Sequence, residues 1–195
     1  MIKVSILGDI GSGKTYISKL FRAPCFSADD EVIKLYKKSK KCFKKLKSKF
    51  PKFIKSFPID KNELFEVIDN DFLNLKKIGF IVHPFVRKKL KIFLKKNIKK
   101  KMVVLDIPLY LENKMNKKED VIIFLKTKKS EINRRLKKRQ SFNVKLINIL
   151  RRSQLSLKQK KNYSDYVLVN NYNNLIMKKR VKILKLKIFN DRNSS

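Results

Sequence analysis

The sequence has no tryptophan, only two alanines and only four glycines among its 195 residues. Its two cysteines, Cys25 and Cys42, are too few for the disulfide framework that supports small secreted domains. Long apolar runs are also missing: Val4–Leu7 and Met102–Leu111 fall short of the ~18–20 residues that span a bilayer. The first residues lack the apolar stretch and cleavage site of a signal peptide. We therefore expect a cytoplasmic protein that binds no membrane.

Acidic residues are scarce as well, with 16 Asp and Glu against 51 Lys and Arg, which gives a formal net charge of +35. Such an excess is typical of proteins that bind nucleic acids. However, only 9 of the 51 are arginine, the residue that reads bases with a bidentate fork, and the lysines are spread along the chain. The abundant residues also have AT-rich codons, so genome composition explains much of the bias. We expect weak, non-specific binding to polyanions and no specific nucleic-acid partner, with a selected basic surface as the alternative.

Hydrophobic residues make up 43% of the chain, which is enough for a core, and they form short apolar runs alternating with helical patterns. The predicted strands are Ile2–Leu7, Pro24–Ala28, Met102–Ile107, Val121–Leu125 and Tyr166–Val169. The predicted helices are about 30–49, 61–78, 84–100, 129–139, 143–161 and 172–189. Because continuous apolar strands suit a sheet covered on both faces, the pattern predicts a doubly wound α/β fold with five parallel strands.

Three of the four glycines fall within Gly8–Thr15, directly after the first predicted strand. The spacing Gly8-x4-Gly13-Lys14-Thr15 matches a phosphate-binding loop. Glycines let the backbone curl so that its N–H groups face phosphate oxygens, and the following helix adds its positive N-terminus. In such loops the lysine holds the β- and γ-phosphates and the hydroxyl binds Mg²⁺. Such a short pattern can arise by chance, but the flanking strand and helix favour nucleotide binding.

Two aspartates close predicted strands and each has two interpretations. Asp29 follows Pro24–Ala28, where a carboxylate could take a proton from an attacking hydroxyl or could cap the next helix. Asp106 closes the third predicted strand and could hold the water shell of Mg²⁺ or be a solvated strand end.

Other candidates lie in predicted basic helices. His83 and Pro84 open a predicted basic helix, where proline in the first turn is ordinary and a lone histidine is usually structural. Arg134, Arg135 and Arg139 share another predicted helix. They could surround a γ-phosphate or belong to a solvated basic face.

In their order along the chain, these segments resemble dephospho-coenzyme A kinases. Leu7–Thr15 is similar to that family's Thr-Gly-Gly-Ile-Gly-Ser-Gly-Lys-Ser/Thr, and Ser27–Asp29 resembles its Asp-Ala-Asp. Val82–Pro84 resembles its Leu-His-Pro, and Asp106–Glu112 resembles its Asp-(Ile/Val)-Pro-Leu-Leu-Phe-Glu.

The resemblance extends to the C-terminal third. Arg135 and Arg139 fall where the family carries its lid arginines. Gln154, Lys160 and Ser164–Asn170 keep the spacing of its Gln…Lys…Ala-Asp-Tyr-Val-Ile-x-Asn ending. The match covers roughly residues 2–171, and the ordered series of motifs is more specific than any one of them beyond the glycine loop.

This resemblance implies a P-loop kinase-like fold in a single domain of residues 1–195, with a helical lid and a small helical insert that binds the acceptor. The core would comprise residues 1–36 and 101–190, the insert about 37–100 and the lid about 129–153.

The family transfers the γ-phosphate of ATP to the 3′-hydroxyl of the ribose of dephospho-CoA, the last step of coenzyme A synthesis. The resemblance therefore implies ATP and Mg²⁺ as cofactors, and Asp29, Lys14 and Arg139 as catalytic residues. The implied ATP-binding residues are Gly8, Gly11, Ser12, Gly13, Lys14, Thr15, Tyr16, Arg135, Arg139 and Asn170. Thr15 and Asp106 would hold the metal. The implied acceptor-binding residues are Asp29, His83, Pro108, Leu109 and Glu112.

The chain departs from the family at three positions. Asp9 replaces a glycine, and a carboxylate there would repel ATP unless it points outward. Ser27 replaces the first aspartate of the acidic pair, and Tyr16 stands where a small residue is common.

Two other functions remain open at this point. Another small-molecule P-loop kinase, such as a nucleoside monophosphate kinase, would share the loop and the fold. A nucleic-acid-binding ATPase would use the positive charge directly, but it would want stacking aromatics in a basic groove, and most phenylalanines here have core spacing. We expect a monomer or a weak homo-oligomer.

Overall fold

The computed structural model describes residues 1–138 and 143–193. Its contacts divide the chain into two compact units, one formed by Met1–Ser27 with Asn97–Ser195 and the other by Ala28–Lys96. The second unit begins at Ala28 and not near residue 37, because helix α2 (Ala28–Lys38) packs against other helices of that unit. Across the described ranges, no helix has both the length and the apolar character needed to cross a bilayer.

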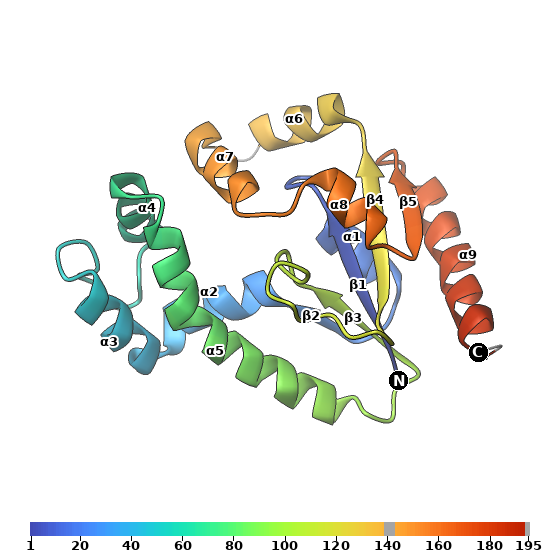
Figure 1. Cartoon of the computed structure of the whole chain (residues 1–195), viewed down its shortest axis with the longest axis horizontal. Coiled ribbons are helices and arrows are strands. Elements are labelled where there is room, and N and C mark those ends of the chain that lie inside the picture. Colours follow the sequence, from blue (N-terminus) through green and yellow to red (C-terminus); the bar gives the residue numbers. More distant parts are fainter. Residues whose placement is uncertain (139–142, 194–195) are drawn as a thin grey trace. The chain divides into compact units, whose positions relative to one another are not determined.

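The first unit contains a sheet of five parallel strands, in the order β2-β3-β1-β4-β5 (Figure 1). The strands are β1 (Ile2–Gly8), β2 (Cys25–Ser27), β3 (Met102–Asp106), β4 (Val121–Thr127) and β5 (Tyr166–Asn170). All five residues of β3 are buried, as are the first five of β4, which explains their unbroken apolar sequence. The predicted doubly wound parallel sheet is confirmed.

Helices cover this sheet on both faces. The helices of this unit are α1 (Lys14–Leu20), α6 (Lys129–Lys137), α7 (Val144–Arg152), α8 (Leu157–Asn162) and α9 (Asn174–Asn193), of which α1, α8 and α9 pack on the sheet. Ile17 and Phe21 at α1 and Met177 and Val181 of α9 join one buried cluster with Val4 of β1, so α1 and α9 cover the same face. In Figure 1, α8 lies in front of β1 and α1 behind it.

The second unit consists of four helices. They are α2, α3 (Lys40–Lys49), α4 (Lys61–Asn70) and α5 (Asn74–Lys96). The long helix α5 contacts each of the other three, so it forms the spine of this unit.

Serine caps divide two helices that the periodicity predicts as continuous. The predicted helix 30–49 is interrupted at Ser39, whose side chain accepts a hydrogen bond from the Cys42 N–H at 3.2 Å. The predicted helix 143–161 is divided into α7 and α8, and Ser156 forms a capping box with Gln159 at the start of α8. Both breaks use the ordinary N-cap chemistry of serine.

The prediction that Pro84 opens a helix is wrong, because Pro84 lies inside α5. The break falls earlier, after α4, where the Asp71 carboxylate accepts a hydrogen bond from the Leu73 N–H at 2.8 Å. Buried side chains then repeat every fourth residue across the proline: Ile78, Val82, Val86 and Leu90. Packing of this continuous apolar stripe outweighs the backbone hydrogen bond that proline removes.

The carboxyl ends of the parallel strands meet at one edge of the sheet. β1 ends at Gly8, β3 at Asp106 and β5 at Asn170, and Thr127 at the end of β4 pairs with Asn170. In open α/β sheets this edge is where ligands bind.

Candidate functional site

Gly8–Thr15, called the phosphate loop below, joins β1 to α1. Gly13 is the N-cap of α1 with a φ of 96°, and a Cβ there would lie 2.9 Å from Asn170 Nδ2. Gly11 has a φ of 85°, and a Cβ there would lie 3.0 Å from the Leu136 side chain. Both positions therefore combine a left-handed backbone with close neighbours, and they require glycine.

The β5 edge of the sheet anchors the loop through its carbonyl oxygens. Asn170 Nδ2 donates to the Ser12 carbonyl at 2.8 Å, and the Thr127 hydroxyl donates to the same carbonyl at 3.3 Å. The Tyr172 hydroxyl donates to the Gly11 carbonyl at 2.9 Å. The loop conformation is thus held by protein contacts before any phosphate binds. Asn170 was predicted to contact the cofactor; the structure places it beneath the loop. Sequence reasoning missed Thr127 and Tyr172, which belong to no motif.

Lys14 folds back along the loop. Its ammonium donates to the Asp9 carbonyl at 2.8 Å and to the Gly8 carbonyl at 3.2 Å. The neighbouring Ser12 side chain is buried, and its hydroxyl has no hydrogen-bond partner within the described residues. A cation and a hydroxyl are therefore both available in the loop for phosphate oxygens.

Thr15 and Asp106 meet at the sheet edge, where the Thr15 hydroxyl donates to Asp106 Oδ2 at 2.6 Å. Two hard oxygen atoms so close together suit Mg²⁺, which is commonly bound by one or two protein oxygens together with water and substrate phosphates. Within the described residues, no group of three or more His, Cys, Asp or Glu could form a metal site made of protein alone. The donor set thus fits a metal that arrives with a nucleotide.

Helix α6 packs directly on the phosphate loop. Its buried Ile132 and Leu136 lie where a Cβ on Gly11 would touch them. The Arg135 guanidinium lies 4.4 Å from the centroid of the Tyr172 ring, a cation–π contact. Arg135 is therefore tied to the tyrosine that anchors the loop.

The other two arginines of this segment, Arg134 and Arg139, were candidates for the phosphate site as well. Arg134 forms an exposed ion pair with Glu131 at 2.7 Å. Arg139, predicted to act on the phosphates, lies outside the described residues.

Two departures from the family pattern have partners in the structure. The Tyr16 hydroxyl donates to Asn174 Oδ1 at 3.0 Å, which links α1 to the start of α9. The Asp9 carboxylate accepts a hydrogen bond from Arg151 Nη2 at 3.0 Å, so its charge is compensated.

Glu112 connects the turn after β3 to the segment between α7 and α8. Its Oε1 accepts a hydrogen bond from the Leu155 N–H at 2.8 Å and lies 3.3 Å from Lys160 Nζ. Lys160 is 1% exposed and donates to Gln154 Oε1 at 2.6 Å. Glu112 Oε2 is buried and has no hydrogen-bond partner in the described part of the chain. Pro108 and Leu109, predicted with Glu112, are half-buried in the same turn.

The second unit holds the remaining predicted residues. Asp29 is the second residue of α2, so it lies in the first helical turn beside Asp30 and not at the N-cap. His83 packs over Gly79 in α5, where a Cβ would lie 3.2 Å from the ring. Burial lowers the pKa of His83, and the nearby Arg87 lowers it further, so the ring is neutral at pH 7.

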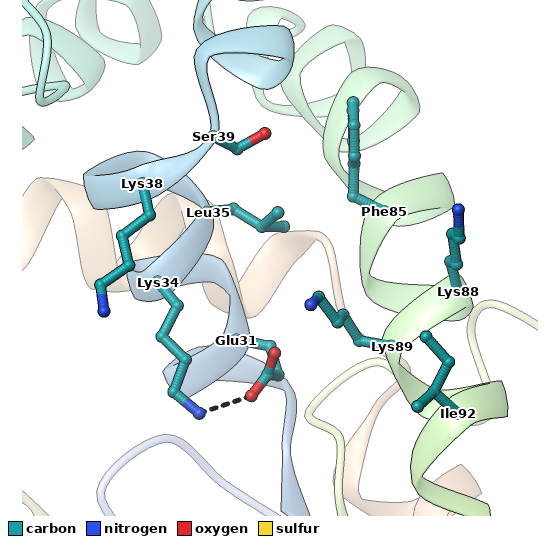
Figure 2. A pocket seen from close by; sticks show the side chains of 9 residues that line it. All are labelled: Glu31, Lys34, Leu35, Lys38, Ser39, Phe85, Lys88, Lys89 and Ile92. Carbon is teal, nitrogen blue, oxygen red and sulfur yellow. Dashed lines mark hydrogen bonds and ion pairs between the residues drawn. The ribbon is translucent and has the colours of Figure 1, made fainter. Parts of the chain in front are cut away.

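A pocket of about 450 Å³ lies between α2 and α5 within the second unit (Figure 2). Lysines and apolar side chains share its lining: Lys34, Lys38, Lys88, Lys89, Leu35, Phe85 and Ile92, together with Glu31 and Ser39. Lys34 is bound to Glu31 at 2.6 Å, and this hydrogen bond raises the pKa of the lysine. The pocket therefore suits a ligand that has both anionic and apolar parts.

Residues 2–175 match the sequence profile of the dephospho-CoA kinase family. The chain belongs to this family. A dephospho-CoA kinase from Bartonella henselae is 31% identical over 170 residues, covering 85% of this chain and 87% of that protein. One from Wolbachia pipientis wMel is 32% identical with the same coverage. The resemblance seen in the sequence is thereby confirmed, and the chain is an enzyme, a kinase that uses ATP.

Solved structures share the fold of this chain. A crystal structure of a Thermus thermophilus protein superposes with a TM-score of 0.78 and 25% identity, covering 95% of this chain and 96% of that one. A dephospho-CoA kinase from Campylobacter jejuni has a TM-score of 0.64 at 19% identity, covering 95% of this chain and 96% of that one. At this identity the second likeness shows the fold alone.

Proposed function

We propose that the enzyme transfers the γ-phosphate of ATP to the 3′-hydroxyl of the ribose of dephospho-CoA, giving coenzyme A and ADP. The observation that carries this proposal is the dephospho-CoA kinase match across residues 2–175, which includes the phosphate loop. The loop geometry supports it, because a preformed loop with an adjacent Thr–Asp pair needs little further organisation to bind a nucleotide.

The first unit supplies the nucleotide chemistry. The N–H groups of Gly11, Ser12 and Gly13 hold phosphate oxygens, and Lys14 places its ammonium on the β- and γ-phosphates. Thr15 and Asp106 hold Mg²⁺, which neutralises phosphate charge when bound. Tyr16, Arg135 and Arg139 complete the ATP site. Asn170 acts by supporting the loop.

The acceptor side uses a base and a set of positioning groups. Asp29 accepts the proton of the 3′-hydroxyl while the O–P bond forms. His83, Pro108, Leu109 and Glu112 bind the acceptor. Glu112 Oε2 is suited to this role because its partner oxygen is already fixed by Leu155 and Lys160.

The purified enzyme should phosphorylate dephospho-CoA in the presence of ATP and Mg²⁺, and chelation of the metal by EDTA should stop the reaction. The assay compares dephospho-CoA with nucleoside monophosphates, shikimate and simple alcohols at equal concentrations, with product identified by mass spectrometry. Turnover with dephospho-CoA at least ~100-fold above the other acceptors is expected, since a site built for one hydroxyl rejects others strongly. Preference for a nucleoside monophosphate would contradict the proposed acceptor.

We further propose that the pocket between α2 and α5 contributes to acceptor binding. Dephospho-CoA carries a diphosphate and a long, weakly polar pantetheine arm, and the pocket offers lysines next to Leu35, Phe85 and Ile92. Lys88 and Lys89 are exposed on α5, where they can reach an anion in the pocket.

The double variant Lys88→Gln/Lys89→Gln is expected to raise the KM for dephospho-CoA about threefold to tenfold, because exposed charge contacts are individually weak. The kcat and the KM for ATP should change little. The matched control is Lys95→Gln/Lys96→Gln, which removes the same charge from the same helix away from the pocket. Equal KM values for the two variants would show that only net charge matters.

A further inference from the structure

Asp9 is the residue of the phosphate loop that the proposed reaction leaves unexplained. Its side chain is 15% exposed, and its carboxylate is held from two directions. Oδ1 accepts a hydrogen bond from the Ile10 N–H at 2.7 Å and another from Arg151 Nε at 3.1 Å. Oδ2 accepts one from Arg151 Nη2 at 3.0 Å. The Arg151 guanidinium thus binds the carboxylate through two hydrogen bonds, and such bidentate ion pairs are among the strongest in proteins.

Arg151 comes from a helix without a fully buried residue. The apolar side chains of α7 (Leu146, Ile147, Ile149 and Leu150) are half-buried. The two residues of the pair stand 142 positions apart in the sequence. A partly buried, bidentate contact in the last turn of α7, at the penultimate residue Arg151, is well placed to help fix this helix beside the loop.

Asp9 also touches the catalytic lysine through its backbone. Its carbonyl oxygen accepts hydrogen bonds from Lys14 Nζ at 2.8 Å and from the Ser12 N–H at 3.2 Å. A carboxylate on the same residue, left without its arginine, would compete with phosphates for Lys14 and would repel them directly. Its partial burial strengthens both effects, because water screens the charge poorly there.

We propose that Arg151 is a positioning residue that neutralises Asp9 and holds its carboxylate away from the phosphates. A phosphate loop with an acidic second residue then keeps ordinary affinity for ATP. This inference rests on ATP binding at the loop and is independent of the acceptor. The competing role for Arg151 is a direct contact with the nucleotide phosphates, and a double-mutant cycle separates the two.

The experiment measures the Kd of ATP with Mg²⁺ by calorimetry for wild type, Arg151→Gln, Asp9→Asn and the double variant. Arg151→Gln should weaken binding about tenfold or more, since it leaves a partly buried charge without its partner. Asp9→Asn keeps an oxygen for the Ile10 N–H and should change binding less than about threefold. In the double variant, affinity should return to within about threefold of wild type, because the charge that Arg151 neutralises is gone.

Arg152→Gln is the matched control, since it removes the same charge from the exposed neighbouring position and should leave ATP binding unchanged. Arg151→Lys should bind ATP with an affinity between those of wild type and Arg151→Gln, because it keeps the charge beside Asp9 and loses the bidentate fork. Circular dichroism and thermal melting confirm that each variant is folded.

Three results would overturn the inference. If the loss in Arg151→Gln persists in the double variant, Arg151 binds phosphate directly. If Arg151→Gln alone binds normally, the Asp9 charge does not reach the nucleotide. If the wild type binds no ATP, both this inference and the proposed function fail. If the enzyme binds ATP but does not phosphorylate dephospho-CoA, only the proposed function fails, and the double-mutant cycle of Asp9 and Arg151 still tests this inference.

Discussion

Replacing Lys14 with alanine is expected to lower turnover by about 10³-fold or more while the fold persists. The Lys14 ammonium already lies over the loop, within hydrogen-bond distance of the Gly8 and Asp9 carbonyls. When the γ-phosphate is transferred, negative charge moves towards the bridging oxygen, and a fixed cation stabilises that charge without reorganising. With alanine at position 14, only water is left to stabilise the charge that develops on the phosphates. The measurement is kcat at saturating ATP and dephospho-CoA, with circular dichroism to confirm the fold.

Lys19→Ala is the control for this prediction. Lys19 lies on the same short helix, is exposed and is the basic residue of its last turn. Its removal changes net charge by the same amount, so turnover should stay near normal. A folded Lys14→Ala enzyme with near-normal turnover would remove the phosphate loop from the mechanism.

Asp29→Asn is expected to lower turnover by ~10²–10⁴, the usual contribution of a positioned general base. Asparagine has almost the same shape and still accepts a hydrogen bond, but it cannot take the proton of the 3′-hydroxyl. The Kd of ATP should change little, because the phosphate loop holds the nucleotide. The experiment therefore compares kcat from steady-state kinetics with nucleotide affinity from calorimetry.

Asp30→Asn is a control on the same helical turn. Asp30 is exposed, and the interaction of its charge with the dipole of α2 stabilises this helix by well under ~1 kcal/mol. Its replacement should leave turnover almost unchanged. Loss of activity in Asp30→Asn but not in Asp29→Asn would show that Asp30, and not Asp29, is the general base. If neither variant loses activity, the base lies elsewhere.

The sheet and the phosphate loop could be predicted because their signals are local. Continuous apolar runs mark each buried strand, and the spacing of Gly8, Gly13 and Lys14 encodes the loop within a few residues of sequence. Asp106 was found in the same way, as the polar end of an apolar strand. Its hydrogen bond with Thr15 is long-range, but Asp106 ends β3 and Thr15 follows the loop after β1, and the carboxyl ends of these neighbouring parallel strands must meet.

The supports of the loop could not be predicted because their partners are distant in sequence and belong to no motif. Tyr172 anchors Gly11 from 161 residues away, and Thr127 reaches Ser12 from 115 residues away. Arg151 looked like one more basic residue among 51. Its role depends on a tertiary contact with Asp9, which the sequence showed only as an unfavourable substitution.

The predicted helix boundary at Pro84 was wrong for a different reason. Proline strongly disfavours the interior of a helix, so Pro84 was interpreted as a first-turn residue. The buried stripe on both sides of it holds α5 together as one helix of 23 residues. Tertiary packing thus overrode a local preference that is usually reliable.

The contact between Asp9 and Arg151 also has a historical consequence. An arginine beside a loop with glycine at position 9 adds no repulsion to ATP. An aspartate at that position without the arginine would repel the phosphates. If Arg151 neutralises Asp9 as proposed, a chain that starts from glycine at position 9 keeps ATP binding throughout only when the arginine is gained before the aspartate. On that proposal Arg151 is a permissive substitution, and its loss is not neutral while Asp9 is present.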